Sequence, residues 1–383
     1  MHRASRLRFI LGLIVGIGLV ATIFMVLSTP GDASDPASTY NLVSTTFLTD
    51  GGRVEWSHDG EWIYYDRKEG DGFWEVYRIR PDGTEKECLT CTHPNLPSRH
   101  KGQPEAHPKG RFLIFQAEKN IHRRPFYSAL PGGGTYNDLY AMDLESENHD
   151  VYRLTNVPRW MYSGSLHAQF NRTGTRLLWG DLQGWGGRYG NWQMAVADFV
   201  VDPEPRLENR RYYDPGPQPI WLEAHAWAPD DSAIYITCTP VAGMDDNNMD
   251  ICRMDFDNPT EVTRLTFTSG LGEEADSWDE HTKMAPLNDV LTWVSSLGFG
   301  TQPNNYYPLW LHTELWIMNL DGSGKRQLTN FNDTKPTVVR DHAWNPSLTG
   351  TRQQMVASVF DQDLKSAEVW IFEFEVGASE ASE

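Results

Sequence analysis

Four histidines recur at one place in a repeated unit of this 383-residue chain. They stand in the segments His167–Phe170, His225–Trp227, His281–Met284 and His342–Trp344. Neutral imidazole nitrogens bind zinc, manganese, iron and nickel. If every unit turns this position toward a common axis, the four rings form a metal or ligand site, and a divalent metal such as manganese or zinc is the expected cofactor. The alternative is a wet polar channel in which each histidine hydrogen-bonds a neighbouring unit.

Other polar residues share this position or lie beside it. The first unit offers Arg53 at this position, and the second offers Gln103. The acids near the repeated position are Glu105, Glu223, Asp279, Glu280 and Asp341. Carboxylates placed there could bind a metal or fix the tautomers of the imidazoles. We therefore predict Gln103, Glu105 and Glu223 as ligand-binding residues.

The elements that must position these residues are short strands. The units open with a short stretch ending in Trp or Phe, followed by a turn and an apolar strand, as in Val54–Tyr65. A third strand with alternating apolar residues follows, for example Glu314–Asn319. Alternation of period two is typical of a half-buried strand. The units close on a Leu-Thr dipeptide, found at residues 48–49, 89–90, 154–155, 265–266 and 328–329.

Four short antiparallel strands per unit predict an all-β fold, a six-bladed β-propeller over residues 41–376. The units begin near Arg53, Gln103, His167, Ala224, His281 and His342. The sixth unit lacks its own Leu-Thr strand, and the segment Leu42–Thr49 precedes the first unit. We expect this N-terminal strand to complete the sixth blade, which removes the exposed edge of an open ring.

The units resemble the TolB-type (WD40-like) β-propeller repeat. The resemblance rests on Trp-Ser-x-Asp-Gly strings and on the near-ideal unit Glu314–Thr329, and it covers roughly residues 40–376. It is weaker in the third unit, where the strand at 191–197 runs on without a Leu-Thr ending. Such a resemblance implies a fold and leaves the function open, because propellers bind, scaffold and catalyse alike.

The histidine arrangement is similar, more distantly, to that of oligogalacturonate lyases, whose propeller holds manganese through His and Gln side chains at the channel. This similarity implies a metal set of His167, Gln169, His225, His281 and His342. It also implies Lys283 as the base and Arg340 as the group that neutralises a uronate. A lyase of this class removes a proton next to a carboxylate, and the metal stabilises the resulting enolate.

The N-terminus predicts a membrane anchor. Residues 9–28 hold a stretch without charge, Phe9–Leu27, preceded by a basic flank in residues 1–8. Its length suits a spanning helix better than the apolar part of a cleaved signal peptide, although cleavage stays open. The basic flank should remain in the cytoplasm. We therefore expect a single-pass protein of the inner or plasma membrane, with its propeller on the periplasmic or extracellular side.

Charge and composition restrict the partners. The formal net charge is −19, and it falls to −22 once the three arginines of the flank are left out. Such a surface disfavours nucleic acid. Residues 29–40 predict a flexible tether and residues 377–383 an acidic tail. A monomer is expected.

The four cysteines predict local crosslinks. Cys238 and Cys252 lie in neighbouring strands of the fourth unit, so we expect a disulfide between them in an oxidising compartment. Cys88 and Cys91 form a single C-x-x-C at a strand end. With no second ligand pair and no helix, a tight local disulfide is preferred over zinc or redox chemistry.

Two functions follow. The first is a membrane-anchored binding or scaffold module that takes a protein or saccharide at the channel mouth, helped by long insertions at Glu118–Tyr136 and Leu297–His312. The second is a metal-dependent polysaccharide lyase or hydrolase that uses the channel histidines. A serine peptidase is disfavoured, because no Gly-x-Ser-x-Gly elbow or hydrolase domain is present in this sequence.

Overall fold

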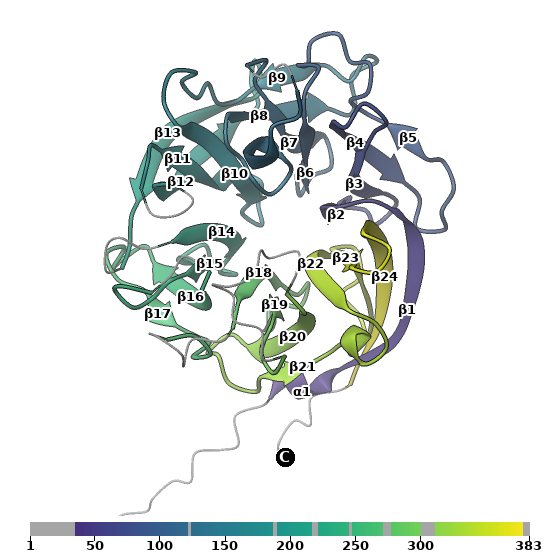
Figure 1. Ribbon diagram of the computed structural model, residues 1–383, viewed down its shortest axis with the longest axis vertical. Coiled ribbons are helices and arrows are strands. Elements are labelled where there is room, and N and C mark those ends of the chain that lie inside the picture. Colours follow the sequence, from purple (N-terminus) through teal and green to yellow (C-terminus); the bar gives the residue numbers. More distant parts are fainter. Residues whose placement is uncertain are drawn as a thin grey trace, which may run out of the picture. The chain divides into compact units, whose positions relative to one another are not determined.

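Six four-stranded antiparallel sheets form a closed ring in the computed structural model (Figure 1). The structure describes residues 35–121, 124–186, 190–216, 221–244, 247–270, 277–299 and 311–377. Each sheet is one blade, and the first strand of each lies nearest the centre of the ring (Figure 1). The predicted six-bladed β-propeller is confirmed.

The first three blades follow one another along the chain. Blade 1 has β2 (Val54–Trp56), β3 (Ile63–Lys68), β4 (Trp74–Ile79) and β5 (Glu87–Cys88). Blade 2 has β6 (Lys101–Ala106), β7 (Phe112–Glu118), β8 (Asn137–Asp143) and β9 (Val151–Arg153), with the 3-10 helix η1 (Tyr127–Ala129) between β7 and β8. Blade 3 has β10 (Ser163–Phe170), β11 (Arg176–Gln183), β12 (Trp192–Val200) and β13 (Arg206–Tyr213).

The other three blades complete the ring. Blade 4 has β14 (Leu222–Trp227), β15 (Ala233–Cys238), β16 (Asp250–Asp255) and β17 (Thr263–Arg264). Blade 5 has β18 (Asp279–Met284), β19 (Val290–Ser295), β20 (Glu314–Asn319) and β21 (Arg326–Gln327), and the 3-10 helix η5 (Phe331–Asp333) follows it. Blade 6 has β22 (Thr337–Trp344), β23 (Arg352–Asp361), β24 (Ser366–Val376) and, on its outer side, β1 (Tyr40–Asp50).

The ring closes through the N-terminal strand, as predicted. β1 pairs antiparallel with β24 from Tyr40 opposite Val376 to Asp50 opposite Glu368. The two ends of the propeller are therefore held in one sheet, which leaves blade 6 without an unpaired outer strand. Tyr40 is fully buried, and its hydroxyl donates to Asp289 at 2.8 Å, which ties the closing strand to blade 5.

The propeller begins earlier than the sequence indicates. Residues Pro36–Thr39 form the short helix α1, which contacts blade 5 (Figure 1). The amide of Ala37 donates to Asn319 Oδ1 at 2.9 Å, and the Arg326 guanidinium donates to the Ala37 carbonyl. The prediction of a flexible tether does not hold for these residues. No helix of the described residues is long and apolar enough to cross a membrane; the predicted anchor at 9–28 and the tail after 377 lie outside them.

Apolar faces of neighbouring blades pack together and form the core. Between blades 2 and 3, for example, Phe112 and Ile114 pack with Leu177 and Trp179, all buried. Large rings fill these gaps between twisted sheets, and Trp56, Trp179 and Trp293 are fully buried. Because the core lies between blades, the first strands are free to present polar side chains to the channel.

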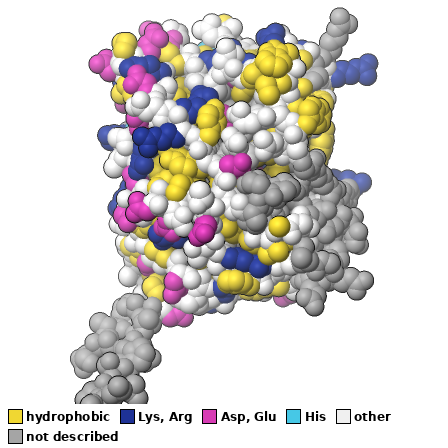
Figure 2. Space-filling model, turned by 90° about the vertical axis from the view of Figure 1, so that its left-hand side faces the viewer, with side chains coloured by type: hydrophobic (Ala, Val, Ile, Leu, Met, Phe, Trp, Pro, Cys, Tyr) yellow, Lys and Arg dark blue, Asp and Glu magenta, His cyan; other side chains and the backbone are white. Residues whose placement is uncertain are grey.

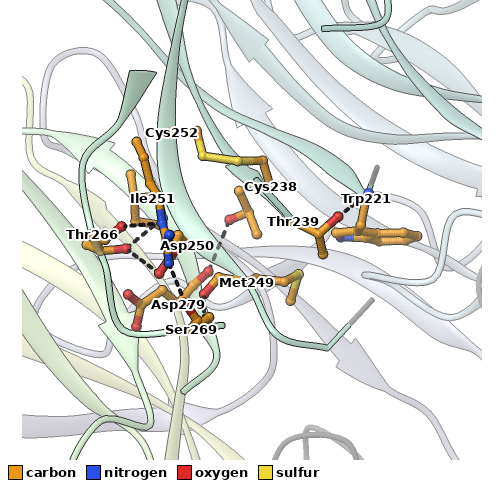
Figure 3. Close-up of a disulfide and its surroundings, with 12 residues drawn as sticks. Trp221, Cys238, Thr239, Met249, Asp250, Ile251, Cys252, Thr266, Ser269 and Asp279 are labelled. Atoms are coloured by element: carbon orange, nitrogen blue, oxygen red, sulfur yellow. Dashed lines mark hydrogen bonds and ion pairs between the residues drawn. A yellow bond between two sulfur atoms is a disulfide. The ribbon is translucent and has the colours of Figure 1, made fainter. Parts of the chain in front are cut away.

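The Leu-Thr dipeptides have a structural reason. In four of the five dipeptides, the threonine hydroxyl accepts a hydrogen bond at 2.9 Å from a backbone amide of the third strand in its blade and donates to the acid that precedes this amide. The threonine–acid pairs are Thr90–Glu75, Thr155–Asp138, Thr266–Asp250 and Thr329–Glu314. Figure 3 shows Thr266 beside Asp250. The dipeptide therefore caps the end of a blade, since buried polar groups must find partners.

Both cysteine pairs are joined in disulfides, Cys88 with Cys91 and Cys238 with Cys252. The second bond joins the end of β15 to β16, in the region of Trp221 and Met249 (Figure 3). It crosslinks one blade and leaves the channel strands untouched. On the side of the ring that carries β13 and β17, acidic, basic and apolar side chains are interspersed (Figure 2).

Candidate functional site

A kink in the first strand turns the predicted channel residues inward. β6, β10 and β18 each carry a β-bulge, and Gln103, His167 and His281 adopt left-handed φ values of 53°, 50° and 56° there. β14 has a bulge at His225. Bulges re-aim a side chain at the cost of local pairing, and left-handed backbone is unfavourable for residues other than glycine. The same distortion in several blades indicates that the fold maintains this level of the channel.

Three of the four predicted histidines form a compact triangle. The ring centroids of His167, His225 and His281 lie 5.2 to 5.3 Å apart, and all three rings are buried. Burial lowers the pKa of His225 and of His281 well below the usual value, and the positive charge of Arg53 lowers that of His281 further. These two imidazoles are therefore neutral at physiological pH.

His342 does not join this triangle, so the prediction of four convergent histidines is wrong for it. Its Nε2 atom is hydrogen-bonded to Thr292 Oγ1 of blade 5 at 2.8 Å, and burial lowers its pKa to about 3. The different position of His342 follows from where the β-bulge of its strand lies. The bulge of β22 falls at Arg340, so His342 lies two residues beyond the distortion that aims the other histidines.

Arg53 lies against the histidine triangle at His281. Its Nη1 atom donates to His281 Nε2 and lies 3.7 Å from Asp341 Oδ2. Its backbone amide donates to Asp66, which also accepts the amide of Gln103 at 2.9 Å. Burial raises the pKa of Asp66 to about 7, although these hydrogen bonds and Arg53 oppose that rise. Asp66 therefore ties the channel strands of blades 1 and 2 together and titrates near neutral pH.

Two carboxyl groups meet beside the triangle. His167 Nε2 lies 2.5 Å from Glu223 Oε1, and His281 Nδ1 lies 3.1 Å from Glu280 Oε2. Burial, repulsion by Glu223 and a hydrogen bond to it raise the pKa of Glu280 well above its usual value. Burial alone would raise the pKa of Glu223 too, but the attraction of His167 and the proton of Glu280 hold it low. The pair therefore shares one proton, with Glu280 as the acid and Glu223 as the carboxylate.

The donor set does not fit a metal ion. Among the described residues, the one group of three ligand atoms close enough to share a metal is Glu75 with Cys88 and Cys91, and those cysteines are disulfide-bonded. In addition, the Arg53 guanidinium contacts His281 Nε2, which is the lone pair a metal would need. A permanent cation at that atom opposes a divalent cation. This contact opposes a metal at His281, and the metal set of His167, Gln169, His225, His281 and His342 stays a prediction.

A second polar level lies one step along the same strands. Lys283 Nζ donates to Gln169 Oε1 at 2.7 Å, and Glu105 accepts the amide of Phe170 at 2.8 Å. Burial and the neighbouring Glu105 raise the pKa of Glu55 well above its usual value, and burial raises that of Glu105. This second carboxyl pair, Glu55–Glu105, has Lys283 as its cation. Lys283, predicted as a base, therefore belongs to this second level.

A cavity of about 650 Å³ opens above the histidine triangle. Its floor includes Arg53, Asp66, Glu223, Glu280 and His281, and Arg340 also lines it. Its walls carry aromatic rings, namely Trp74, Tyr127, Tyr162, Trp192, Trp221, Trp278 and Phe360. Of the predicted ligand-binding residues, Glu223 lines this cavity. Gln103 is not among the lining residues and is hydrogen-bonded to His167. Glu55, Glu105 and Lys283 are not among its lining residues.

The predicted insertion of blade 2 forms part of this cavity. Tyr127, Ser128, Leu130, Pro131 and Gly133 line it. Residues 122–123 of this insertion, and residues 300–310 of the blade 5 insertion, lie outside the described residues. Lys119, at the start of this insertion, is buried, and its Nζ atom lies 3.0 Å from Asp138 Oδ2.

The aromatic walls of the cavity were not predicted from the sequence, although the sequence contains a signal for them. Tyr162, Trp221 and Trp278 each stand directly before the first strand of blades 3, 4 and 5. Their repeat places one ring per blade at the cavity end of the channel. Arg53 was recognised as the residue of the first unit, but its reach across to His281 depends on folding in three dimensions.

Comparisons with known proteins support the fold of this chain and do not identify its function. No protein-family model matches the chain, and no curated protein matches its sequence. Similar solved structures include TolB from Acinetobacter baumannii, at 15% identity and a TM-score of 0.48, covering 84% of this chain and 65% of that chain. A putative TolB from Agrobacterium tumefaciens has 15% identity and a TM-score of 0.44, covering 76% and 87%. A gluconolactonase from Xanthomonas campestris has 11% identity and a TM-score of 0.50, covering 91% and 99%.

The chain thus spans less than two thirds of the TolB chain from Acinetobacter baumannii. At these identities the likenesses concern the fold alone. By its six blades the chain is a six-bladed β-propeller, and its repeat units resemble those of the TolB type. The similarity to oligogalacturonate lyases stays a prediction.

Proposed function

We propose that this propeller is a saccharide-binding module, exported and held at the membrane by residues 9–28, with its binding site in the cavity above the histidine triangle. The observation that carries the proposal is the combination of an aromatic wall with a hydrogen-bonding floor in one cavity. Its volume of about 650 Å³ lies within the usual range for small-ligand sites.

The wall suits the apolar faces of sugar rings. Trp192 and Trp221 meet edge to face, with centroids 6.1 Å apart, and Trp278 lies 6.0 Å from the His281 ring. Flat aromatic rings offer large contact areas at a small cost in side-chain entropy. A pyranose ring presents C–H groups on its faces and hydroxyls at its edge, so it can use such a wall and a polar floor together.

The floor suits hydroxyl groups. Glu223 accepts hydrogen bonds and Arg53 donates them, and each is buried against a fixed partner. Groups that are already held in place lose little freedom when a ligand binds. Five lysine and arginine side chains and four acids stand among the described lining residues, so the cavity accommodates neutral and acidic sugars despite the net charge of −19.

The test is a glycan panel on the purified full-length chain in detergent, with neutral and acidic oligosaccharides, read by tryptophan fluorescence and calorimetry. We expect at least one saccharide to bind, and Trp221→Ala to weaken it about tenfold. Trp62→Ala is the matched control, because Trp62 is half-buried and packs against Arg78 and Arg80 away from the cavity. Equal losses in both variants, or no binding saccharide, would refute the proposal.

One observation favours a second candidate function, acid–base catalysis on the bound saccharide. The Glu223–Glu280 pair holds a carboxylate and a protonated carboxyl side by side at the cavity floor. Catalysis of this kind predicts that Glu280→Gln retains binding and loses turnover of the bound glycan. The lyase alternative with Lys283 as base lacks this support, because Lys283 does not line the cavity.

A further inference from the structure

A stacked pair of aromatic rings continues the cavity wall toward solvent. Tyr162 lines the cavity, and the Trp185 ring stacks on it with centroids 4.1 Å apart and an interplanar angle of 7°. Trp185 nevertheless stays 81% exposed. Its second face is therefore accessible, and an exposed indole forgoes the stabilisation that burial would give.

The position of the stack follows from the topology of blade 3. Tyr162 directly precedes β10, whereas Trp185 lies in the connection between β11 and β12. The strand that follows, β12, begins at Trp192, which also lines the cavity. The stack is therefore built from two connections at the cavity end of a single blade.

Local packing holds the stack in place. A Cβ added at Gly190, whose φ is +108°, would lie 2.4 Å from Leu182 and 3.0 Å from the Tyr162 ring. The backbone therefore passes close against Tyr162 at a point where glycine alone fits. On another side, Tyr136 meets Tyr162 at an interplanar angle of 89° with centroids 6.3 Å apart. A ring fixed in this way forms a rigid platform.

We propose that the Tyr162–Trp185 stack is an outer subsite, which binds a further sugar unit of an oligosaccharide whose end occupies the cavity. This inference rests on the proposed function. It commits the site to a chain of sugars, since the cavity would bind one end and Tyr162, which lines the cavity, carries the platform next to it. The free face of Trp185 offers one flat apolar contact, which matches one pyranose face.

The experiment measures affinity against chain length. The probe is a ladder of one to six sugar units prepared from the saccharide that binds best in the panel, titrated into the full-length protein. In the wild type we expect affinity to rise about tenfold as the chain grows past the cavity. Trp185→Ala should remove this gain and leave the shortest ligand within about twofold of wild type, whereas Trp185→Phe should keep most of the gain.

Phe267→Ala is the matched control, because Phe267 is 71% exposed on blade 4 and does not line the cavity. Its length dependence should equal that of the wild type, and thermal melting should show that each variant is folded. If the wild type binds short sugars without any gain from length, or if Trp185→Ala keeps the gain, the outer subsite is refuted while the cavity proposal stands. If no saccharide binds, both fall.

Discussion

The channel contains two carboxyl pairs that differ in their surroundings. Glu223–Glu280 borders the cavity and touches two imidazoles, whereas Glu55–Glu105 lies farther along the same strands beside Lys283 and does not line the cavity. In each pair, burial and the partner raise the pKa of one carboxyl, so that each pair shares a proton. The same chemistry thus occurs twice on the first strands. We expect the pair that lines the cavity, Glu223–Glu280, to bind the ligand, and the pair that does not, Glu55–Glu105, to stabilise the fold.

The largest expected effect comes from removing one acid of each pair. Glu223→Ala should weaken saccharide binding about a hundredfold, because it removes an acceptor fixed by His167. Glu105→Ala should change binding less than about twofold but lower the free energy of unfolding by about 2 to 3 kcal/mol, since the Phe170 amide loses its buried acceptor. Calorimetry and urea unfolding measure the two quantities. A large binding loss in Glu105→Ala would break the distinction between the levels.

The pH dependence of stability sharpens the comparison at the cavity level. Asp66 has a folded pKa of about 7 against an ordinary value of 3.8, so the folded state binds its proton more tightly. Its contribution is fully present below about pH 4 and is lost as the pH rises through 7. Urea unfolding at several pH values gives the free energy of unfolding of the wild type and of Asp66→Asn. The excess stability of the wild type over this variant should decrease by about 2 kcal/mol between pH 5 and pH 8.

His342 has the opposite effect on stability, because its pKa is lowered to about 3 and its contribution is lost as the pH falls below about 6.5. Both proteins contain His342, so its contribution is removed when one unfolding free energy is subtracted from the other. A constant difference between wild type and Asp66→Asn over the whole pH range would show that Asp66 does not titrate there.

A smaller effect is expected where the blade 2 insertion meets Arg53. A Cβ at Gly132, with φ +86°, would lie 2.3 Å from Arg53 Nη2. Gly132→Ala should cost about 1 kcal/mol of stability through backbone strain, and it should also weaken binding by displacing the guanidinium. Gly298→Ala is the control, because its φ is +91° and nothing lies within 4 Å of the added Cβ. If both variants bind alike, Arg53 has no role in the cavity.

The smallest effect concerns metal. Because Arg53 contacts the His281 lone pair, we expect elemental analysis of the protein, purified without a metal resin, to give no stoichiometric manganese, zinc or iron. The double variant His225→Ala/His281→Ala should give the same metal content as wild type. About one metal ion per chain that disappears in the double variant would restore the metal hypothesis.

The sequence predicted the ring well because the repeat carries its own reasons. The Leu-Thr dipeptides, the alternating third strands and the unpaired segment before Arg53 each correspond to a hydrogen-bonding need in the structure. The site was predicted less well. His342 shares its Ala-Trp context with His225, and only the shift of a β-bulge to Arg340 separates the two. The position of a bulge depends on packing across blades, which local sequence does not encode.

The measurement that tests the central claim most directly is hydrogen–deuterium exchange of the full-length chain, with and without the saccharide that binds best. The account predicts slower exchange in the cavity segments around Ser128–Gly133, Leu222–Ala224 and Asp279–His281, and no change at Glu55 or Gln169 of the second level. Slower exchange confined to the second level or to the outer strands, or no change anywhere, would contradict it.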